Sequence, residues 1–172
     1  KNGAYHMPLG LEVCGELHQA ALQQAVDTLV ANHESLRTRF VDVGGEPRQR
    51  ILDDAAVIVQ WQDLSDEASS EDVHRCQHEV LTKPFDLAAD ALLRVQVVKL
   101  SAQRYQLMLV QHHIIGDGIS MQLLLAELSK LYRLAHQGAR LVPSPAAIQY
   151  ADYAAWQQQW LNSDEARAHE TK

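Results

Sequence analysis

Two adjacent histidines, His112 and His113, stand where an apolar stretch ends, and Gly116, Asp117 and Gly118 follow them closely. A histidine changes its charge near neutral pH, so one at the end of a strand is a candidate general base or positioning group. Gly118 lies where a helix is expected to begin, and backbone N–H groups there can stabilise a developing oxyanion. Two hydrogen-bonded histidines at the edge of a core would show the same spacing, so the residues alone leave both interpretations open.

Other kinds of chemistry fit the sequence poorly. Neighbouring histidines on one strand diverge, and no third nitrogen or sulfur ligand stands near Asp117 in the sequence, which argues against a metal site. No serine lies in a nucleophile elbow of the GxSxG type, so a serine-based triad is not indicated. Cys14 and Cys76 lie far apart and outside any CxxC pattern. They are expected to be buried, reduced thiols.

The composition is that of one ordinary globular domain. The chain has 172 residues, of which 47% are hydrophobic and 22% charged, and this is enough for a core. A formal net charge of −7 argues against a nucleic-acid partner, because such binding needs clustered Lys and Arg. No apolar stretch reaches the roughly 20 residues of a membrane helix, and no signal peptide is recognisable. The sequence therefore predicts a cytoplasmic protein with no membrane partner.

Hydrophobic periodicity predicts the elements that must position these residues. The expected strands are 9–14, 57–64, 91–100 and 104–113. Helices are expected within 17–34, from a cap in 65–70 to near Pro84, from near Gly118 to Gly138, and over 150–160. A hairpin is expected to turn at Gly44 and Gly45. Hairpins outnumber crossover units, which favours an α/β sandwich with a mixed, mostly antiparallel sheet. If the last strand reaches residue 113, alternation directs the two histidines to opposite sides of that sheet.

Four sequence motifs together resemble one known family. "HHIIGDG" at 112–118 resembles the HHxxxDG signature of the condensation domains of nonribosomal peptide synthetases, which are related in fold to chloramphenicol acetyltransferase. "NHESLRTRF" at 32–40 is similar to the RHExLRTxF motif of that family, and "KPFDL" with the following "LLRV" is similar to its PFDL…LR segment. "QYADYAAWQ" at 149–157 resembles its YxDYAxW motif. The motifs occur in family order and span nearly the whole chain.

The resemblance implies a fold and a domain organisation. The expected fold is a chloramphenicol acetyltransferase-like two-layer sandwich, with helices packed on a mixed, mostly antiparallel sheet. Residues 1–162 would form the N-terminal lobe of a condensation domain, and 163–172 a frayed tail. The C-terminal lobe is expected to be absent, so the isolated half-domain would be inactive. The tunnel that holds the reaction centre lies between the two lobes in this family.

The resemblance also implies a reaction and a set of roles. The amine of one carrier-bound aminoacyl group attacks the thioester of an acyl or peptidyl group on another carrier. His113 would position or deprotonate the amine, Asp117 would orient the loop, and Gly118 would leave space for the phosphopantetheine arm. His112 would hold the strand end in place. The lobe itself is expected to bind no cofactor, and its partners would be donor and acceptor peptidyl carrier proteins, the second lobe and neighbouring adenylation modules.

The sequence departs from the family pattern at two positions. Asn32 stands where the motif usually has an arginine, a candidate partner for Asp117. A neutral hydrogen bond, or an ion pair moved to Arg37, is the expected replacement. His18 stands where an aspartate cap is common, so a weaker helix start is expected.

Two further questions stay open at this point. The large aromatics of the last helix repeat at helical spacing, which is more typical of core packing than of a ligand-stacking site. Because this helix leads toward the second lobe in the family, packing between lobes is the preferred version. The alternatives to amide formation are a non-catalytic recruitment module of the same fold and an epimerisation domain.

Overall fold

A mixed four-stranded sheet forms the centre of the protein. The computed structural model describes residues 3–65 and 69–163. The strand order is β1-β6-β5-β4, with β1 and β6 antiparallel, β6 and β5 antiparallel, and β5 and β4 parallel. The strands are β1 (His6–Cys14), β4 (Gln60–Asp63), β5 (Leu93–Ser101) and β6 (Arg104–His112). The predicted α/β fold with a mixed, mostly antiparallel sheet is confirmed.

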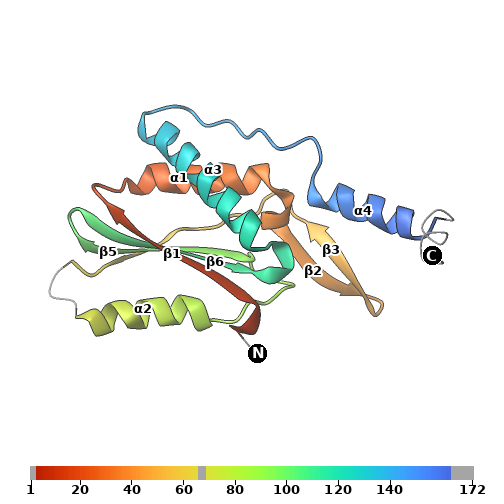
Figure 1. The fold of residues 1–172 in the computed structure, drawn as a ribbon, viewed down its shortest axis with the longest axis horizontal. Coiled ribbons are helices and arrows are strands. Elements are labelled where there is room, and N and C mark those ends of the chain that lie inside the picture. Colours follow the sequence, from red (N-terminus) through yellow and green to blue (C-terminus); the bar gives the residue numbers. More distant parts are fainter. Residues whose placement is uncertain (1–2, 66–68, 164–172) are drawn as a thin grey trace.

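Helices cover both faces of this sheet (Figure 1). Helices α1 (Gln19–Asn32) and α3 (Gly118–His136) lie side by side on one face, and α2 (Ser70–Thr82) lies on the other. Ser69 and Asp72 form a capping box at the start of α2. The sheet with α1 and α3 forms the predicted sandwich, and α2 adds a single helix to its second face.

Strand β6 is apolar on both sides because each side meets a helix. Leu107 and Leu109 belong to the main core together with side chains of α1 and α3. Met108 and Val110 pack instead against Val80 of α2. Successive side chains of a strand point to opposite faces, so this nearly continuous apolar run is what a central strand between two helical layers requires.

A hairpin outside the main sheet lies near the end of β6 and lines a cavity described below. A short 3₁₀ turn η2 (Glu34–Arg37) leads into β2 (Thr38–Val43), which pairs antiparallel with β3 (Glu46–Ile51). Gly44 and Gly45 take φ values of 66° and 88°, which side chains with a Cβ rarely adopt. The predicted hairpin is confirmed.

Helix α4 (Tyr150–Leu161) extends from the body of the protein, as Figure 1 shows. None of its residues is buried among the described part of the chain. Its aromatic row, which consists of Tyr150, Tyr153, Trp156 and Trp160, stays exposed. The rings of Trp156 and Trp160 stack on each other at 6.4 Å between centroids. The expected packing of this row into the core is therefore wrong within the described residues, whereas packing between lobes stays a prediction.

Three local expectations need correction or comment. The strand expected at 57–64 is reduced to β4, because Gln23 of α1 hydrogen-bonds the carbonyl of Val57 and the N–H of Val59 in place of a neighbouring strand. Cys76 is buried, but Cys14 is exposed at the end of the edge strand β1. His18 gives α1 no side-chain cap, as expected. Residues 164–172, where the tail was expected, lie outside the described residues.

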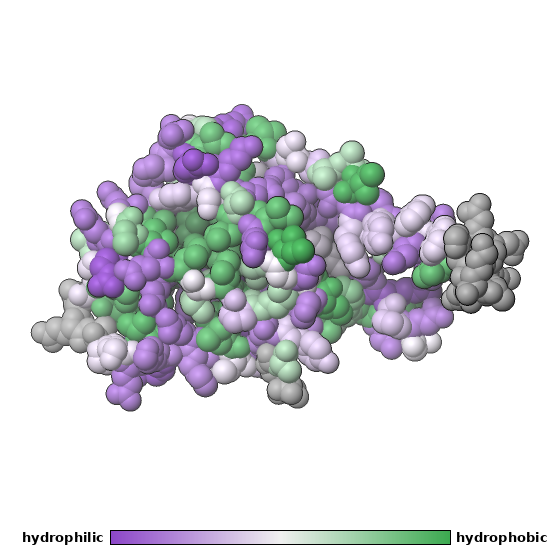
Figure 2. All heavy atoms as spheres, viewed as in Figure 1, coloured by the Kyte–Doolittle hydropathy of each residue, from purple (hydrophilic) through white to green (hydrophobic). Residues whose placement is uncertain are grey.

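Apolar side chains also gather on the surface. Figure 2 shows them in the middle of the face seen in Figure 1, over β1 and beside α3. Ile119 and Leu123 on α3 are 71% and 66% exposed. Among the described residues, no helix is both long and apolar enough to cross a membrane.

Candidate functional site

His113 and His112 line two separate cavities. Strand β6 ends at His112, one residue earlier than expected, and His113 begins the short 3₁₀ turn η3 (His113–Ile115). His113 lines a cavity of about 580 Å³ together with Asp117 and Ser120. His112 lines a second cavity of about 400 Å³ with His6. The two histidine rings therefore face different cavities, although His113 lies outside the strand.

The ring of His113 is held by the backbone of its own loop. Its Nδ1 lies 2.7 Å from the carbonyl oxygen of Gly116. A carbonyl only accepts hydrogen bonds, so Nδ1 must carry the proton that it donates. In the neutral ring Nε2 is then unprotonated, and it has no hydrogen-bond partner among the described residues. This arrangement leaves an exposed histidine with a free basic nitrogen at the cavity.

Gly116 is held against a buried side chain. A Cβ at this position would lie 2.3 Å from Nε2 of Gln111 and 2.7 Å from Oγ of Ser120. Gln111 is only 1% exposed, so it has little room to move. The backbone of Gly116 is extended, and the glycine is therefore required by close approach rather than by conformation. The sequence analysis did not predict the contact between Gly116 and Gln111, because nothing local in the sequence shows that Gln111 lies behind the loop.

Asp117 is the N-cap of α3. Its carboxylate accepts a hydrogen bond of 2.8 Å from the N–H of Ser120, and its own N–H donates to Oγ of Ser120. The backbone and side-chain hydrogen bonds from Ser120 lower the pKa of the Asp117 carboxyl, with smaller help from the N–H of Ile119 and from His113. Asp117 is thus an ionised carboxylate that fixes the loop, and it is placed to hold α3 rather than to exchange protons.

The expected partners of Asp117 lie elsewhere. The side chain of Asn32 donates to Glu127 at 2.8 Å. Arg37 donates to the carbonyl of Leu52 and lies 3.7 Å from Glu34. Neither expected replacement for the family's arginine therefore reaches Asp117 in the described part of the chain. The physical reason is that Asn32 and Arg37 are held by these other partners, while Ser120 bonds Oδ1 of Asp117.

His112 connects the strand end to the turn that follows it. Its Nδ1 accepts a hydrogen bond of 3.1 Å from the N–H of Ile114, and its ring meets Phe85 edge-on at 5.8 Å between centroids. Burial lowers the pKa of His112, and the nearby His6 and His113 lower it further. A neutral ring is the form that can accept from Ile114. This contact is of the kind that a structural role for His112 requires.

Gly118 begins α3 and does not line the cavity of His113. A Cβ added there would meet no atom within 4 Å, so the space beside it is open.

The cavity of His113 is also lined by residues that lie far from the histidines in sequence: Glu34, Ser35, Thr38, Phe40, Gln49, Tyr150 and Ala151. They belong to η2, the hairpin and α4. Within the described residues, no group of three or more His, Cys, Asp or Glu could hold a metal ion.

Comparison with known families gives one match over nearly the whole chain. Residues 1–171 match the family described as "Condensation domain". Malpinin synthetase from Mortierella alpina is 36% identical over 165 residues, which is 95% of this chain but 2% of that synthetase. This chain therefore spans only a small part of that relative.

Two solved structures share the fold and part of the sequence. The first condensation domain of the calcium-dependent antibiotic synthetase, in complex with a substrate analogue, has a TM-score of 0.80 and 28% identity, over 95% of this chain and 39% of that one. A complex of the X-domain and OxyB from teicoplanin biosynthesis has a TM-score of 0.84 and 31% identity, over 94% and 35% of the two chains. Both likenesses cover at least 94% of this chain.

Proposed function

Because this chain belongs to the condensation-domain family and is homologous to condensation domains of nonribosomal peptide synthetases, we propose that it supplies the histidine side of an amide-forming centre. The substrates are a carrier-bound acyl or peptidyl thioester and the amine of a second carrier-bound aminoacyl group. The chain covers between a third and two fifths of the solved relatives compared above. The complete centre therefore needs the rest of such a domain.

One observation carries this proposal. Nδ1 of His113 is committed to the carbonyl of Gly116, which leaves Nε2 as the basic nitrogen of a ring at the cavity. The amine nitrogen bonds to the thioester carbon while its proton passes to Nε2. The C–S bond then breaks, and the departing thiolate takes the proton from His113. Proton transfer of this kind contributes about 10²–10⁴-fold to a rate.

Positioning contributes to the same step. A thioester is already activated, so holding the amine in line with its carbonyl carbon supplies part of the rate without any proton transfer. Asp117 serves this by fixing the start of α3 through Ser120. The open space beside Gly118 suits a phosphopantetheine arm that arrives covalently on a carrier protein. His112 keeps the turn before the loop in place.

The test compares His113→Ala with wild type in the complete domain. Donor and acceptor carrier proteins are loaded, and the amide product is followed by mass spectrometry. His74→Ala is the matched control, because His74 is exposed on α2 and belongs to neither cavity. A fall of about two orders of magnitude or more for His113→Ala, with the control unchanged, is the expected result. A rate within threefold of wild type would refute His113 as the base.

A second candidate function is favoured by one comparison. The teicoplanin X-domain, 31% identical to this chain, is seen in complex with OxyB. A recruitment module would bind a partner enzyme and form no amide. If wild-type protein with loaded and bound carriers gave no product, this second function would replace the first. An epimerisation domain would instead invert a carrier-bound residue, which chiral analysis of the same samples detects.

A further inference from the structure

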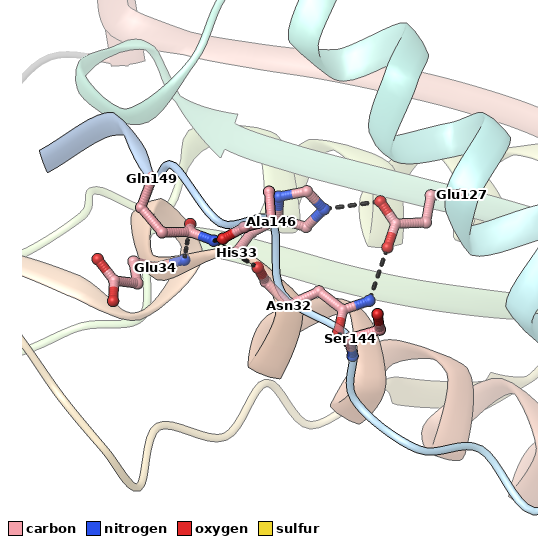
Figure 3. A network of polar contacts seen from close by, with 7 residues as sticks. All are labelled: Asn32, His33, Glu34, Glu127, Ser144, Ala146 and Gln149. Carbon is pink, nitrogen blue, oxygen red and sulfur yellow. Dashed lines mark hydrogen bonds and ion pairs between the residues drawn. The ribbon is translucent and has the colours of Figure 1, made fainter. Parts of the chain in front are cut away.

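A network of polar contacts joins α1, α3 and the segment that leads to α4 (Figure 3). Residues 139–149 contain no helix or strand, and we call them the connector. Asn32, the last residue of α1, contacts both α3 and the connector. Its side-chain N–H₂ donates to Glu127 of α3 at 2.8 Å, and its side-chain oxygen accepts from the N–H of Ser144 at 2.7 Å.

A second anchor holds the end of the connector. The side-chain amide of Gln149 donates to the backbone carbonyl of Asn32 at 3.1 Å, and its oxygen accepts from the N–H of Glu34 at 3.1 Å. Gln149 also donates to the carbonyl of Ala146, within the connector itself. All three hydrogen bonds that Figure 3 draws from the side-chain amide of Gln149 therefore go to backbone groups.

Polar contacts matter here because the connector buries little apolar surface. Val142 and Ile148 are 70% and 74% exposed. Asn32, in contrast, is only 8% exposed. A buried amide is retained only when its donors and acceptors are satisfied, and losing one partner leaves the other unpaired. The anchoring of the connector therefore depends on Asn32 more than on any apolar contact of these residues.

The same anchors set one wall of the cavity of His113. Tyr150 and Ala151 follow Gln149 directly and line that cavity. Tyr150 is also the first residue of α4. Any displacement of the connector end moves these two residues. Within the described part of the chain, the hydrogen bonds of the loop that holds His113 involve no residue of the network.

We propose that Asn32 is a positioning residue, which fixes the connector and thereby the Tyr150 wall of the cavity. Where the family motif usually has an arginine, the neutral side chain of Asn32 bridges Glu127 and Ser144. The catalytic part of this inference rests on the proposed amide-forming function. The structural part, the anchoring of the connector, does not depend on it.

The first experiment measures amide hydrogen exchange at the N–H groups of Ser144 and Gln149 in the complete domain, because both donate hydrogen bonds to side chains. Asn32→Leu keeps the size of the side chain and removes both of its hydrogen bonds, so exchange should rise at least tenfold. Asp27→Asn is the matched control, because Asp27 is exposed on the same helix and outside the network. Unchanged exchange in a folded Asn32→Leu variant would overturn the proposal.

A reversed pair separates the hydrogen bond from a general loss of stability. N32D keeps the acceptor for Ser144 but places a carboxylate against Glu127, so exchange should rise. In N32D/E127Q the new amide can donate to the new carboxylate, and exchange should return to within about threefold of E127Q alone. A double variant that exchanges as fast as N32D would refute the bridge. These variants also serve if Asn32→Leu does not fold.

The catalytic readout is the split between KM and kcat. A displaced wall weakens substrate binding without touching His113, so Asn32→Leu should raise KM several-fold and leave kcat within about twofold. An equal loss in kcat with unchanged KM would refute the positioning role. If wild type formed no product, the proposed function would fail, while the exchange result would still decide the anchoring of the connector.

Discussion

Replacing Gly116 by alanine tests how tightly the loop of His113 is held. The new Cβ would lie 2.3 Å from Nε2 of Gln111, whereas ordinary contact begins at 3.4 Å. Gln111 is 1% exposed, and Ser120 is committed to the cap of Asp117, so neither yields freely. The loop must therefore move by about 1 Å to restore contact distances. Overpacking of this kind costs about 1–3 kcal/mol of stability.

The movement has a specific consequence for the histidine. The bond from Nδ1 of His113 to Gly116 is 2.7 Å long, and a shift of about 1 Å takes it beyond hydrogen-bonding range. The ring then loses the contact that selects its tautomer and orientation. A misplacement of that size reduces kcat/KM by about 10²-fold.

Three measurements on Gly116→Ala decide whether the loop at Gly116 orients the ring of His113. Urea unfolding gives the stability, ¹⁵N NMR gives the tautomer of His113, and product formation in the complete domain gives the rate. Gly118→Ala is the control for stability, because its added Cβ meets no atom within 4 Å. If Gly116→Ala kept the wild-type tautomer and a rate within threefold, the account of how the loop orients His113 would be refuted.

Three other results are expected. Gly118→Ala should unfold at the same or a higher urea concentration, since alanine gains up to about 1 kcal/mol at a compatible site. It should still raise KM for loaded carriers if their arm passes there, and an unchanged KM would exclude that path. The lowered pKa of Asp117 means that its contribution to stability is present above the unfolded pKa of about 3.9 and is lost as the pH falls below it. The difference in unfolding midpoint between wild type and Asp117→Ala should therefore narrow in acid, and a constant difference from pH 7 to pH 2.5 would contradict the cap. The His112 ring should titrate below 6.5 by NMR, because its burial disfavours the charged form, and a midpoint above 6.5 would contradict this.

Much of the fold followed from local patterns in the sequence. The turn at Gly44 and Gly45, the central pair of β5 and β6 and the long helix α3 all rest on periodicity and turn chemistry within short windows. The failures have tertiary causes. Gln23 shortened the strand expected at 57–64, because a side chain from another element took the hydrogen bonds of a strand partner.

For the candidate site, the sequence by itself determined the residue types: a histidine pair, an aspartate and two glycines in one loop, within motifs that indicate the family. Only the tertiary structure decided what those residues touch. Gln111 lies against Gly116, and Asn32 meets Glu127 and Ser144, which are 95 and 112 positions away in the sequence. Such contacts depend on strand order and on how helices dock on the sheet. These are properties of the whole packed chain, and no window of sequence contains them.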